Sequence, residues 1–172
     1  MVNLIITLIS IALIAIVAVA ALYNGGDAFR QGSANASAAQ LVNAGQQISA
    51  ANILYANDNG GTYATNIADL TANGAYLSSI PRVPEGFTVQ DDLTAGGNES
   101  NLIQVVSADP AIEVCESVNK QAGYDETTVT TANTNGDFVL ANSGEITQTF
   151  GCYGDNTAGY TCLLYTSPSP RD

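Results

Sequence analysis

The sequence predicts an α+β protein, with a long N-terminal helix followed by a small antiparallel sheet head and a helix stapled to that head by a disulfide. Three observations lead to this fold class. Residues 2–23 are predominantly apolar and uncharged, and the first acidic or basic residue is Asp27. A second stretch, starting at Ser33, has the periodicity of a helix. The remainder places short β-branched segments between Gly- and Asn-rich turns.

The uncharged stretch is long enough to span a membrane. About 22 helical residues reach roughly 33 Å, and a hydrocarbon core is about 30 Å thick. A cleavable signal peptide fits poorly, because such peptides begin with positive charges and carry only about 7–15 apolar residues. A plain anchor usually has basic residues at its cytoplasmic flank, and Met1 to Asn3 supply none. This missing flank suggests that a leader was removed, or that the gene starts elsewhere.

The composition narrows the function classes. The chain has 172 residues, which suggests one domain beyond the anchor. It carries 16 acidic and 4 basic residues, for a net charge of −12, so nucleic acid and anionic lipid headgroups are excluded as partners by charge. The absence of His removes the commonest general base and metal ligand. We therefore expect no enzyme activity, no catalytic residues and no cofactor.

The last residues differ in composition from the rest of the chain. Residues 162–172 (Cys-Leu-Leu-Tyr-Thr-Ser-Pro-Ser-Pro-Arg-Asp) resemble the translated read-through of a sequencing adapter. The alternative is a short Pro-rich tail. On the adapter interpretation this tail is not native, and the natural C-terminus was lost near Thr161. We therefore leave the tail out of the fold prediction.

The cysteines predict one disulfide. With Cys162 set aside, Cys115 and Cys152 form an even pair, and in an exported domain such a pair usually closes a loop. A loop of this size corresponds to roughly 3–4 kcal/mol of stabilisation in the chain-entropy estimate. Two alternatives are a pair of buried free thiols, or a Cys152–Cys162 bond that leaves Cys115 unpaired.

The membrane segment leads into an amphipathic helix. Gly25 and Gly26 each weaken a helix by roughly 1 kcal/mol relative to Ala, which predicts a hinge. Beyond the N-cap candidate Ser33, small or apolar residues recur at intervals of three and four, on one face. The residues of this stripe are Ala34, Ala38, Leu41, Gly45, Ile48, Ala51 and Tyr55. Residues 57–61 (Asn-Asp-Asn-Gly-Gly) end the helix.

The head is predicted from turn signals and short apolar segments. Asp109 and Pro110 open a helix that Gly123 closes. Asn135-Gly136 is the strongest hairpin signal, with strands on either side. The predicted elements are a helix at 65–70, an extended segment at 80–86, strands at 87–89, 102–106, 127–131, 137–141 and 145–153, and the helix at 109–122. The predicted regions are a filament-core or membrane helix (1–24), a hinge and helix continuation (25–58), the head (59–161) and the tail (162–172).

Asp91, Asp92, Asn98 and Glu99 are candidate calcium ligands, because they place hard oxygen donors on one Gly-containing loop. No complete calcium-loop motif is present. No phosphate-binding loop or nucleotide fingerprint is visible either. We expect no other metal site.

This layout resembles the type IV pilins, and three stretches are similar to type IVb and conjugative-pilus major pilins. They are residues 50–55 (Ala-Ala-Asn-Ile-Leu-Tyr), 75–81 (Ala-Tyr-Leu through Ile-Pro) and 114–123 (Val-Cys-Glu-Ser-Val-Asn-Lys-Gln-Ala-Gly). The resemblance covers most of residues 1–153. It departs from the family in two respects: no basic leader ending in Gly is present, and Ile5 stands where the family usually has Glu.

The resemblance implies a structural subunit that polymerises through its N-terminal helix into an extracellular filament on a prokaryotic cell, with heads exposed for adhesion, motility or DNA transfer. It implies membrane anchoring before assembly, other copies as partners, an inner-membrane assembly machinery and a prepilin peptidase. Cys115 and Cys152 would close a surface loop. The residues expected to pack in the filament core are Leu4, Ile5, Leu8, Ala12, Ala15, Ala18, Leu22, Ala34, Ala38, Leu41 and Ile48.

Two further function classes remain open. A minor pilin or secretion pseudopilin would cap or prime a filament. A membrane-anchored exported binding domain would never polymerise. Small residues on a membrane helix permit close helix packing, but they are also compatible with a simple anchor.

Overall fold

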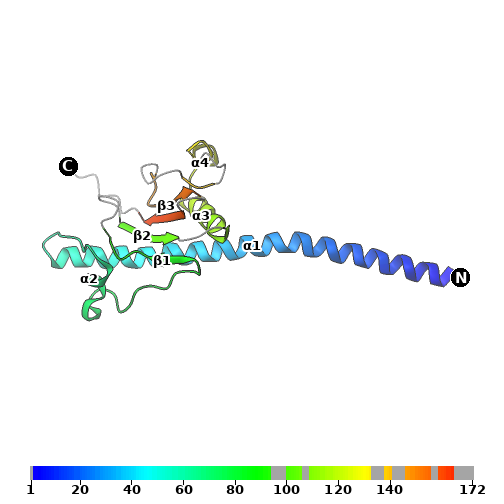
Figure 1. Cartoon of the computed structure of the whole chain (residues 1–172), viewed down its shortest axis with the longest axis horizontal. Helices are drawn as coiled ribbons and strands as arrows, with labels where there is room; N and C mark the ends of the chain where they lie inside the picture. Colours follow the sequence, from blue (N-terminus) through cyan, green and yellow to red (C-terminus); the bar gives the residue numbers. More distant parts are fainter. Residues whose placement is uncertain are drawn as a thin grey trace. The chain divides into compact units, whose positions relative to one another are not determined.

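The computed structural model describes residues 2–93, 100–105, 109–132, 138–140, 146–155 and 159–164 (Figure 1). The chain divides into two compact units, Met1–Ser33 and Ala34–Asp172. The first unit contains only the beginning of a helix. The second contains the continuation of that helix together with all other elements.

The predicted long N-terminal helix is confirmed. Helix α1 (Val2–Asp58) runs without interruption through both glycines of the predicted hinge. A Cβ atom at Gly25 or Gly26 would meet nothing within 4 Å, so no close contact requires glycine there. Adding one residue to an existing helix is far less costly than nucleating a new one, and a long helix therefore tolerates two glycines. A hinge at this point stays a prediction.

Within the second unit, one face of α1 forms the spine of the core. Six of the seven predicted stripe residues are buried, and Tyr55 is half-buried. Leu41 and Ile48 are 1% and 0% exposed, and burying such side chains contributes about 1.5–3 kcal/mol each. The other main members of this core are Ala64, Ile67, Leu70, Phe87, Leu93, Val114, Val118 and Val139.

Helix α1 ends where the sequence predicts. The backbone N–H of Gly61 donates to the carbonyl of Ala56 at 2.7 Å, and the N–H of Asn59 donates to the carbonyl of Tyr55. Gly60 and Gly61 have φ values of 67° and 91°, a left-handed conformation that favours glycine at a helix C-terminus. The short helices α2 (Ile67–Thr71) and η1 (Ala72–Gly74) follow, near the predicted 65–70.

The strands are β1 (Phe87–Val89), β2 (Ser100–Val105), β3 (Phe150–Asp155) and β4 (Gly159–Leu164). Their backbones pair antiparallel in the order β1-β2-β4-β3. The first strand has its predicted bounds, and β2 begins two residues before the predicted 102–106. The last strand, predicted from residue 145, begins only at Phe150. Strand β4 includes residues 162–164 of the predicted non-native tail.

The predicted strand at 127–131 is wrong, because these residues belong to helix α4 (Glu126–Ala132). The Asp125 carboxylate caps this helix and accepts hydrogen bonds from the backbone N–H and hydroxyl of Thr127, at 3.0 and 2.9 Å. Val129 is fully buried in a second small core with Phe138, Leu140 and Ile146. The β-propensity of the Thr-rich segment was overridden by this cap and this burial. Asn135 and Gly136 lie outside the described residues.

The predicted helix beginning at Asp109 is present as α3 (Asp109–Ala122), and the predicted disulfide is confirmed. Cys115 on α3 is bonded to Cys152 on β3, with the two Cα atoms 5.3 Å apart. Both cysteines are fully buried. The alternatives of two free thiols and of a Cys152–Cys162 bond are therefore excluded in this structure.

Candidate assembly surface

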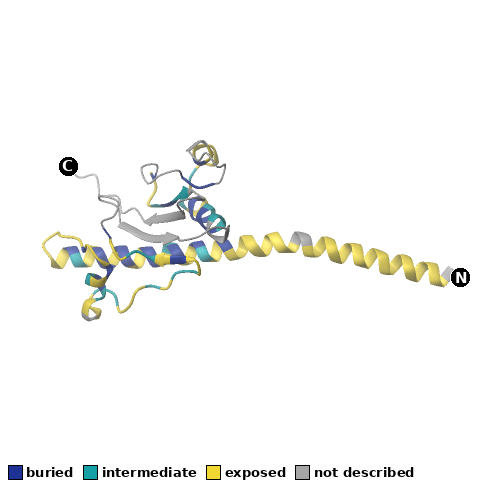
Figure 2. Ribbon diagram, viewed as in Figure 1, coloured by how far each residue is buried: buried dark blue, intermediate teal, exposed yellow. Residues whose placement is uncertain are grey.

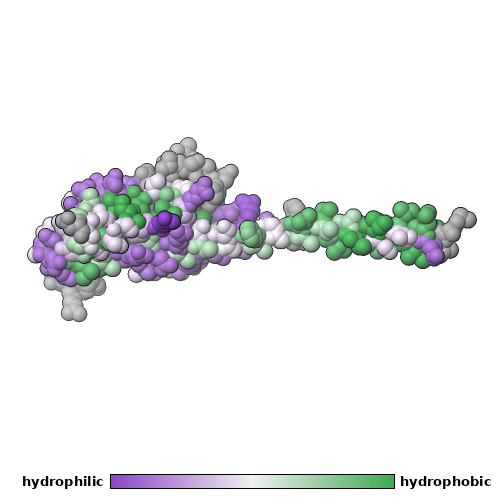
Figure 3. Space-filling view, turned by 90° about the horizontal axis from the view of Figure 1, so that it is seen from below, coloured by the Kyte–Doolittle hydropathy of each residue, from purple (hydrophilic) through white to green (hydrophobic). Residues whose placement is uncertain are grey.

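The N-terminal half of α1 exposes apolar side chains on every side. Every residue from Asn3 to Leu22 is exposed, and Figure 2 shows this part of the helix in yellow. The large side chains range from 55% exposed at Ile5 to 78% at Leu22. Figure 3 colours most of this half green, for hydrophobic. Because the apolar side chains are not confined to one face, this half of the helix requires apolar surroundings on all sides.

This helix is the one helix of the described residues that is long and apolar enough to cross a membrane. A membrane anchor and a signal sequence both satisfy that criterion. Its few polar side chains bond to their own helix: Ser10 Oγ donates to the carbonyl of Ile6 at 2.9 Å, and the Thr7 hydroxyl donates to the carbonyl of Asn3. Hydroxyls paired in this way enter an apolar environment at little cost.

The predicted packing residues fall into two groups. Those in the first half of α1 are exposed. Three of them, Ala12, Ala15 and Ala18, are small and recur every third residue, so they leave room for another helix to approach closely. The remaining residues of this exposed group are Leu4, Ile5, Leu8 and Leu22.

The four predicted packing residues in the second half of α1 lie elsewhere. Ala34, Ala38, Leu41 and Ile48 are 8% exposed or less and belong to the chain's own core. Their side chains hold the head to α1, so they are not accessible to another copy of the chain. The periodicity in the sequence located a buried face correctly but did not reveal what covers it.

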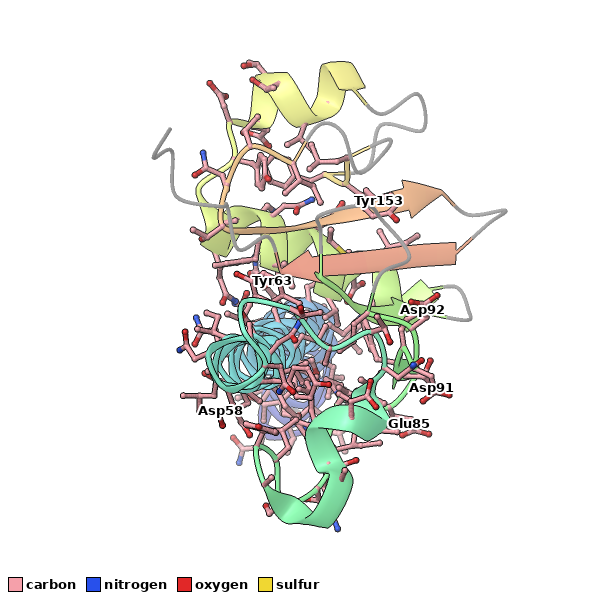
Figure 4. All side chains as sticks on the ribbon, turned by 90° about the vertical axis from the view of Figure 1, so that its left-hand side faces the viewer. Asp58, Tyr63, Glu85, Asp91, Asp92 and Tyr153 are labelled. Atoms are coloured by element: carbon pink, nitrogen blue, oxygen red, sulfur yellow. A yellow bond between two sulfur atoms is a disulfide. The ribbon has the colours of Figure 1, made fainter. Side chains whose placement is uncertain are left out.

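The predicted calcium ligands are only partly described. Asp91 and Asp92 are exposed, and Figure 4 shows them on the opposite side of the view from Asp58, at the end of α1. The loop that carries them is fixed by backbone hydrogen bonds, from Ile67 N to the Asp91 carbonyl at 3.0 Å and from Leu93 N to the Thr65 carbonyl at 2.9 Å. Asn98 and Glu99 lie outside the described residues. Among the described residues, no group of three His, Cys, Asp or Glu side chains is placed to hold a metal ion.

Asn119 is an important residue that the sequence did not single out. It is fully buried, and its Nδ2 donates to the carbonyls of Phe138 and Cys152, both at 3.0 Å. Its Oδ1 accepts from the backbone N–H of Cys152 at 2.7 Å. The side chain thus fixes β3 to α3 beside the disulfide. The signal in the sequence that could have identified Asn119 was its position four residues after Cys115, on the apolar face of α3.

Asn52 has a similar role at the other end of the core. It is 5% exposed, and its Oδ1 accepts a hydrogen bond from the backbone N–H of Ala64 at 2.8 Å. This bond joins α1 to the segment that leads into α2. Buried amides of this kind stabilise a fold only when they are paired, and their partners are distant in sequence.

Three groups in the head have shifted pKa values. The hydrogen bond that Tyr76 donates to Asp58, at 3.0 Å, raises the pKa of the Tyr76 hydroxyl. Burial raises the pKa of Tyr124. The hydrogen bonds from Thr127 lower the pKa of Asp125. Each shift follows from local structure, and the three groups do not form a common site.

No family model, curated protein or solved structure matches this chain.

Proposed function

We propose that this chain is the structural subunit of an extracellular filament of the type IV pilin kind. The apolar half of α1 would hold it in a membrane before assembly and would pack against other copies in the filament. The heads, in which the strands would form a small antiparallel sheet, would then be exposed for adhesion, motility or DNA transfer.

The observation that carries the proposal is the difference in burial between the two halves of α1. One unbroken helix is exposed and apolar in its first half and is built into a disulfide-bonded core in its second half. Transferring an exposed Leu or Ile from water to apolar surroundings is favourable by about 1.5–3 kcal/mol. A lipid bilayer supplies such surroundings first, and a bundle of identical helices supplies them afterwards.

One feature of the first half favours the bundle over a simple anchor. Ala12, Ala15 and Ala18 form a row of small side chains that is inclined to the helix axis, and helices in apolar surroundings associate mainly by close packing. The hydroxyls of Thr7 and Ser10 are already bonded to the helix itself, so neither lipid nor a bundle needs to provide partners for them. In this proposal the inner-membrane assembly machinery and a prepilin peptidase are further partners.

The decisive experiment compares two substitutions in cells that produce the chain. Ala15→Leu keeps the helix apolar but fills the space needed for close packing. Ile14→Leu is the matched control, because it changes shape and not bulk. We expect filaments in the material sheared from cells with the control, and few or none with Ala15→Leu, while both variants remain in the membrane fraction.

Cryo-electron microscopy and mass spectrometry of the sheared material complete the test. Core density that fits the apolar half of α1 would support the proposal, and the N-terminal peptide would define the mature start. If the unmodified chain stays in the membrane without filaments, an anchored exported domain is the better description. A chain present only in traces within a filament of another protein would be a minor pilin or pseudopilin, and secretion of the head without residues 2–22 would identify a signal sequence.

A further inference from the structure

The tripeptide Asn-Gly-Gly occurs twice in this chain, at residues 24–26 and at residues 59–61. An asparagine that precedes glycine can react with its own backbone, because glycine has no side chain to keep its nitrogen away from the asparagine Cγ. Two further Asn-Gly dipeptides, at 73–74 and 135–136, lack the second glycine. The two tripeptides share the same local chemistry, so their surroundings in the structure decide which of them reacts.

The first tripeptide lies inside a helix. Asn24, Gly25 and Gly26 belong to α1, which continues without a break on both sides of them. Helical geometry pairs the backbone N–H of Gly25 with the carbonyl four residues earlier, and it fixes the backbone dihedral angles that the reaction has to change. Asn24 can therefore react only after the helix has opened locally. The helix protects the first tripeptide.

The second tripeptide lies in an exposed turn at the end of α1, which Figure 4 views from that end. The helix stops at Asp58, one residue before Asn59. The backbone N–H of Gly61 donates to the carbonyl of Ala56 at 2.7 Å, whereas no acceptor within the described part of the chain is recorded for the backbone N–H of Gly60. The nitrogen that has to attack is therefore not held by the helix.

The turn also has room to rearrange. A Cβ atom built on Gly60 or Gly61 would meet nothing within 4 Å, so neighbouring atoms do not restrict the backbone there. The Asn59 Nδ2 donates to the carbonyl of Tyr55 at 2.8 Å in an exposed hydrogen bond. A hydrogen bond of this kind contributes only about 0.5–1.5 kcal/mol net. The Asn59 amide can therefore leave Tyr55 and turn toward the Gly60 nitrogen at small cost.

We infer that Asn59 is a site of spontaneous deamidation in the folded chain. The Gly60 backbone nitrogen attacks the Asn59 Cγ, the bond from Cγ to Nδ2 breaks, and the proton of the Gly60 N–H leaves with Nδ2 as ammonia. The product is a five-membered succinimide ring. One water molecule adds to either ring carbonyl and opens the ring, which leaves aspartate or isoaspartate at position 59. The reaction needs only this turn and water, so the inference does not depend on the proposed function.

The modification would weaken the end of α1. It replaces Nδ2, the donor to the Tyr55 carbonyl, with a carboxylate oxygen that cannot donate. The new negative charge lies next to Asp58 and at the negative end of the helix dipole, and both repel it. The Tyr76 hydroxyl donates to Asp58 at 3.0 Å and lies within hydrogen-bonding reach of the Asn59 side chain. The contact between α1 and the segment that follows η1 would therefore weaken as well.

Incubation of the full chain in detergent at mildly alkaline pH tests the inference. Samples taken over time are digested with chymotrypsin, which cleaves after aromatic residues and places the two tripeptides on separate peptides, bounded by Tyr23 and Phe29 and by Tyr55 and Tyr63. Mass spectrometry with electron-transfer fragmentation locates each conversion and distinguishes isoaspartate from aspartate. Synthetic peptides of residues 20–29 and 55–64 give the rate of each tripeptide without the folded structure.

We expect similar rates in the two synthetic peptides, and in the folded chain a rate at Asn59 that is several-fold higher than the rate at Asn24. Asn59→Gln is the matched control, because it keeps an amide but would have to close a larger ring, and it should show little conversion at position 59. A rate at Asn59 no higher than that at Asn24 in the folded chain overturns the inference.

A second comparison tests the effect on the helix. Asn59→Asp introduces the charge of one product, and it should lower the hydrogen-exchange protection of the last turn of α1 below that of Asn59→Gln. Equal protection in the two variants would overturn the expected weakening of the helix end.

Discussion

The two halves of α1 are parts of one helix, yet they encounter different surroundings. From Asn3 to Leu22 every residue is exposed, and large apolar side chains point in all directions. From Ala34 to Ala56 the helix is amphipathic, with small and apolar residues buried in the head and amides exposed on the opposite face. The comparison shows that helical periodicity appears in a sequence only where the two sides of a helix face different media.

The largest expected effect comes from removing a core side chain in the second half. Leu41→Ala should lower the free energy of unfolding of the head by about 2–5 kcal/mol, because Leu41 is 1% exposed and the substitution leaves a cavity. Leu13→Ala is the matched control, since Leu13 is 58% exposed in the first half. Urea unfolding in detergent, followed by tyrosine fluorescence, measures both. Equal losses would show that the first half also packs on the head.

A smaller effect is expected from hydrogen bonds. Asn119→Ala should cost about 1–3 kcal/mol, because the buried Phe138 carbonyl and Cys152 N–H lose the hydrogen bonds that the Asn119 amide makes to them. Ser10→Ala removes a bond that the exposed hydroxyl makes within its own helix turn, and it should change stability by less than about 0.5 kcal/mol. The same unfolding experiment compares them. A negligible cost for Asn119→Ala would mean that water or another side chain replaces the amide.

The smallest expected effect depends on pH. The Thr127 hydrogen bonds lower the pKa of Asp125 in the folded chain, so the carboxylate stabilises α4 above the unfolded pKa. This contribution is lost as the pH falls through the lowered folded pKa. The protection factor of the Thr127 amide against hydrogen exchange, taken relative to the intrinsic exchange rate at each pH, should therefore fall in acid, and Asp125→Asn should weaken that dependence. The first half has no carboxylate before Asp27 and should not respond to acid. An unchanged acid response in Asp125→Asn would assign it to another group.

Several features of the fold were predictable because they depend on neighbours in sequence. The stripe from Ala34 to Tyr55, the turn at 57–61 and the opening of α3 at Asp109 all follow from periodicity and local capping signals. The disulfide was predicted from the cysteine count and from the expectation that the chain is exported. The candidate assembly surface at residues 4–22 was likewise predictable, because the sequence shows an uncharged stretch there.

The errors arose where distant residues decide the outcome. Residues 127–131 are rich in β-branched Thr, and only the burial of Val129 beside Phe138, Leu140 and Ile146 shows why the segment is helical. Leu41 and Ile48 were predicted to pack in a filament core, but they lie in the core of the chain's own head. A helical stripe has the same pattern whether the chain's own head or another copy covers it. The significance of Asn119 depends on carbonyls that come from two later segments.

By itself, the sequence determined that the chain begins with a membrane-length apolar helix, that the helix continues with one packing face, and that two cysteines form a pair. These properties come from composition and spacing, which local physical chemistry converts directly into structure. Only the tertiary structure decided that the chain's own head, and not another copy, covers the packing face from Ala34 to Tyr55. The reason is that burial is a relation between distant segments, and a packing face does not specify in its own residues which segment will cover it.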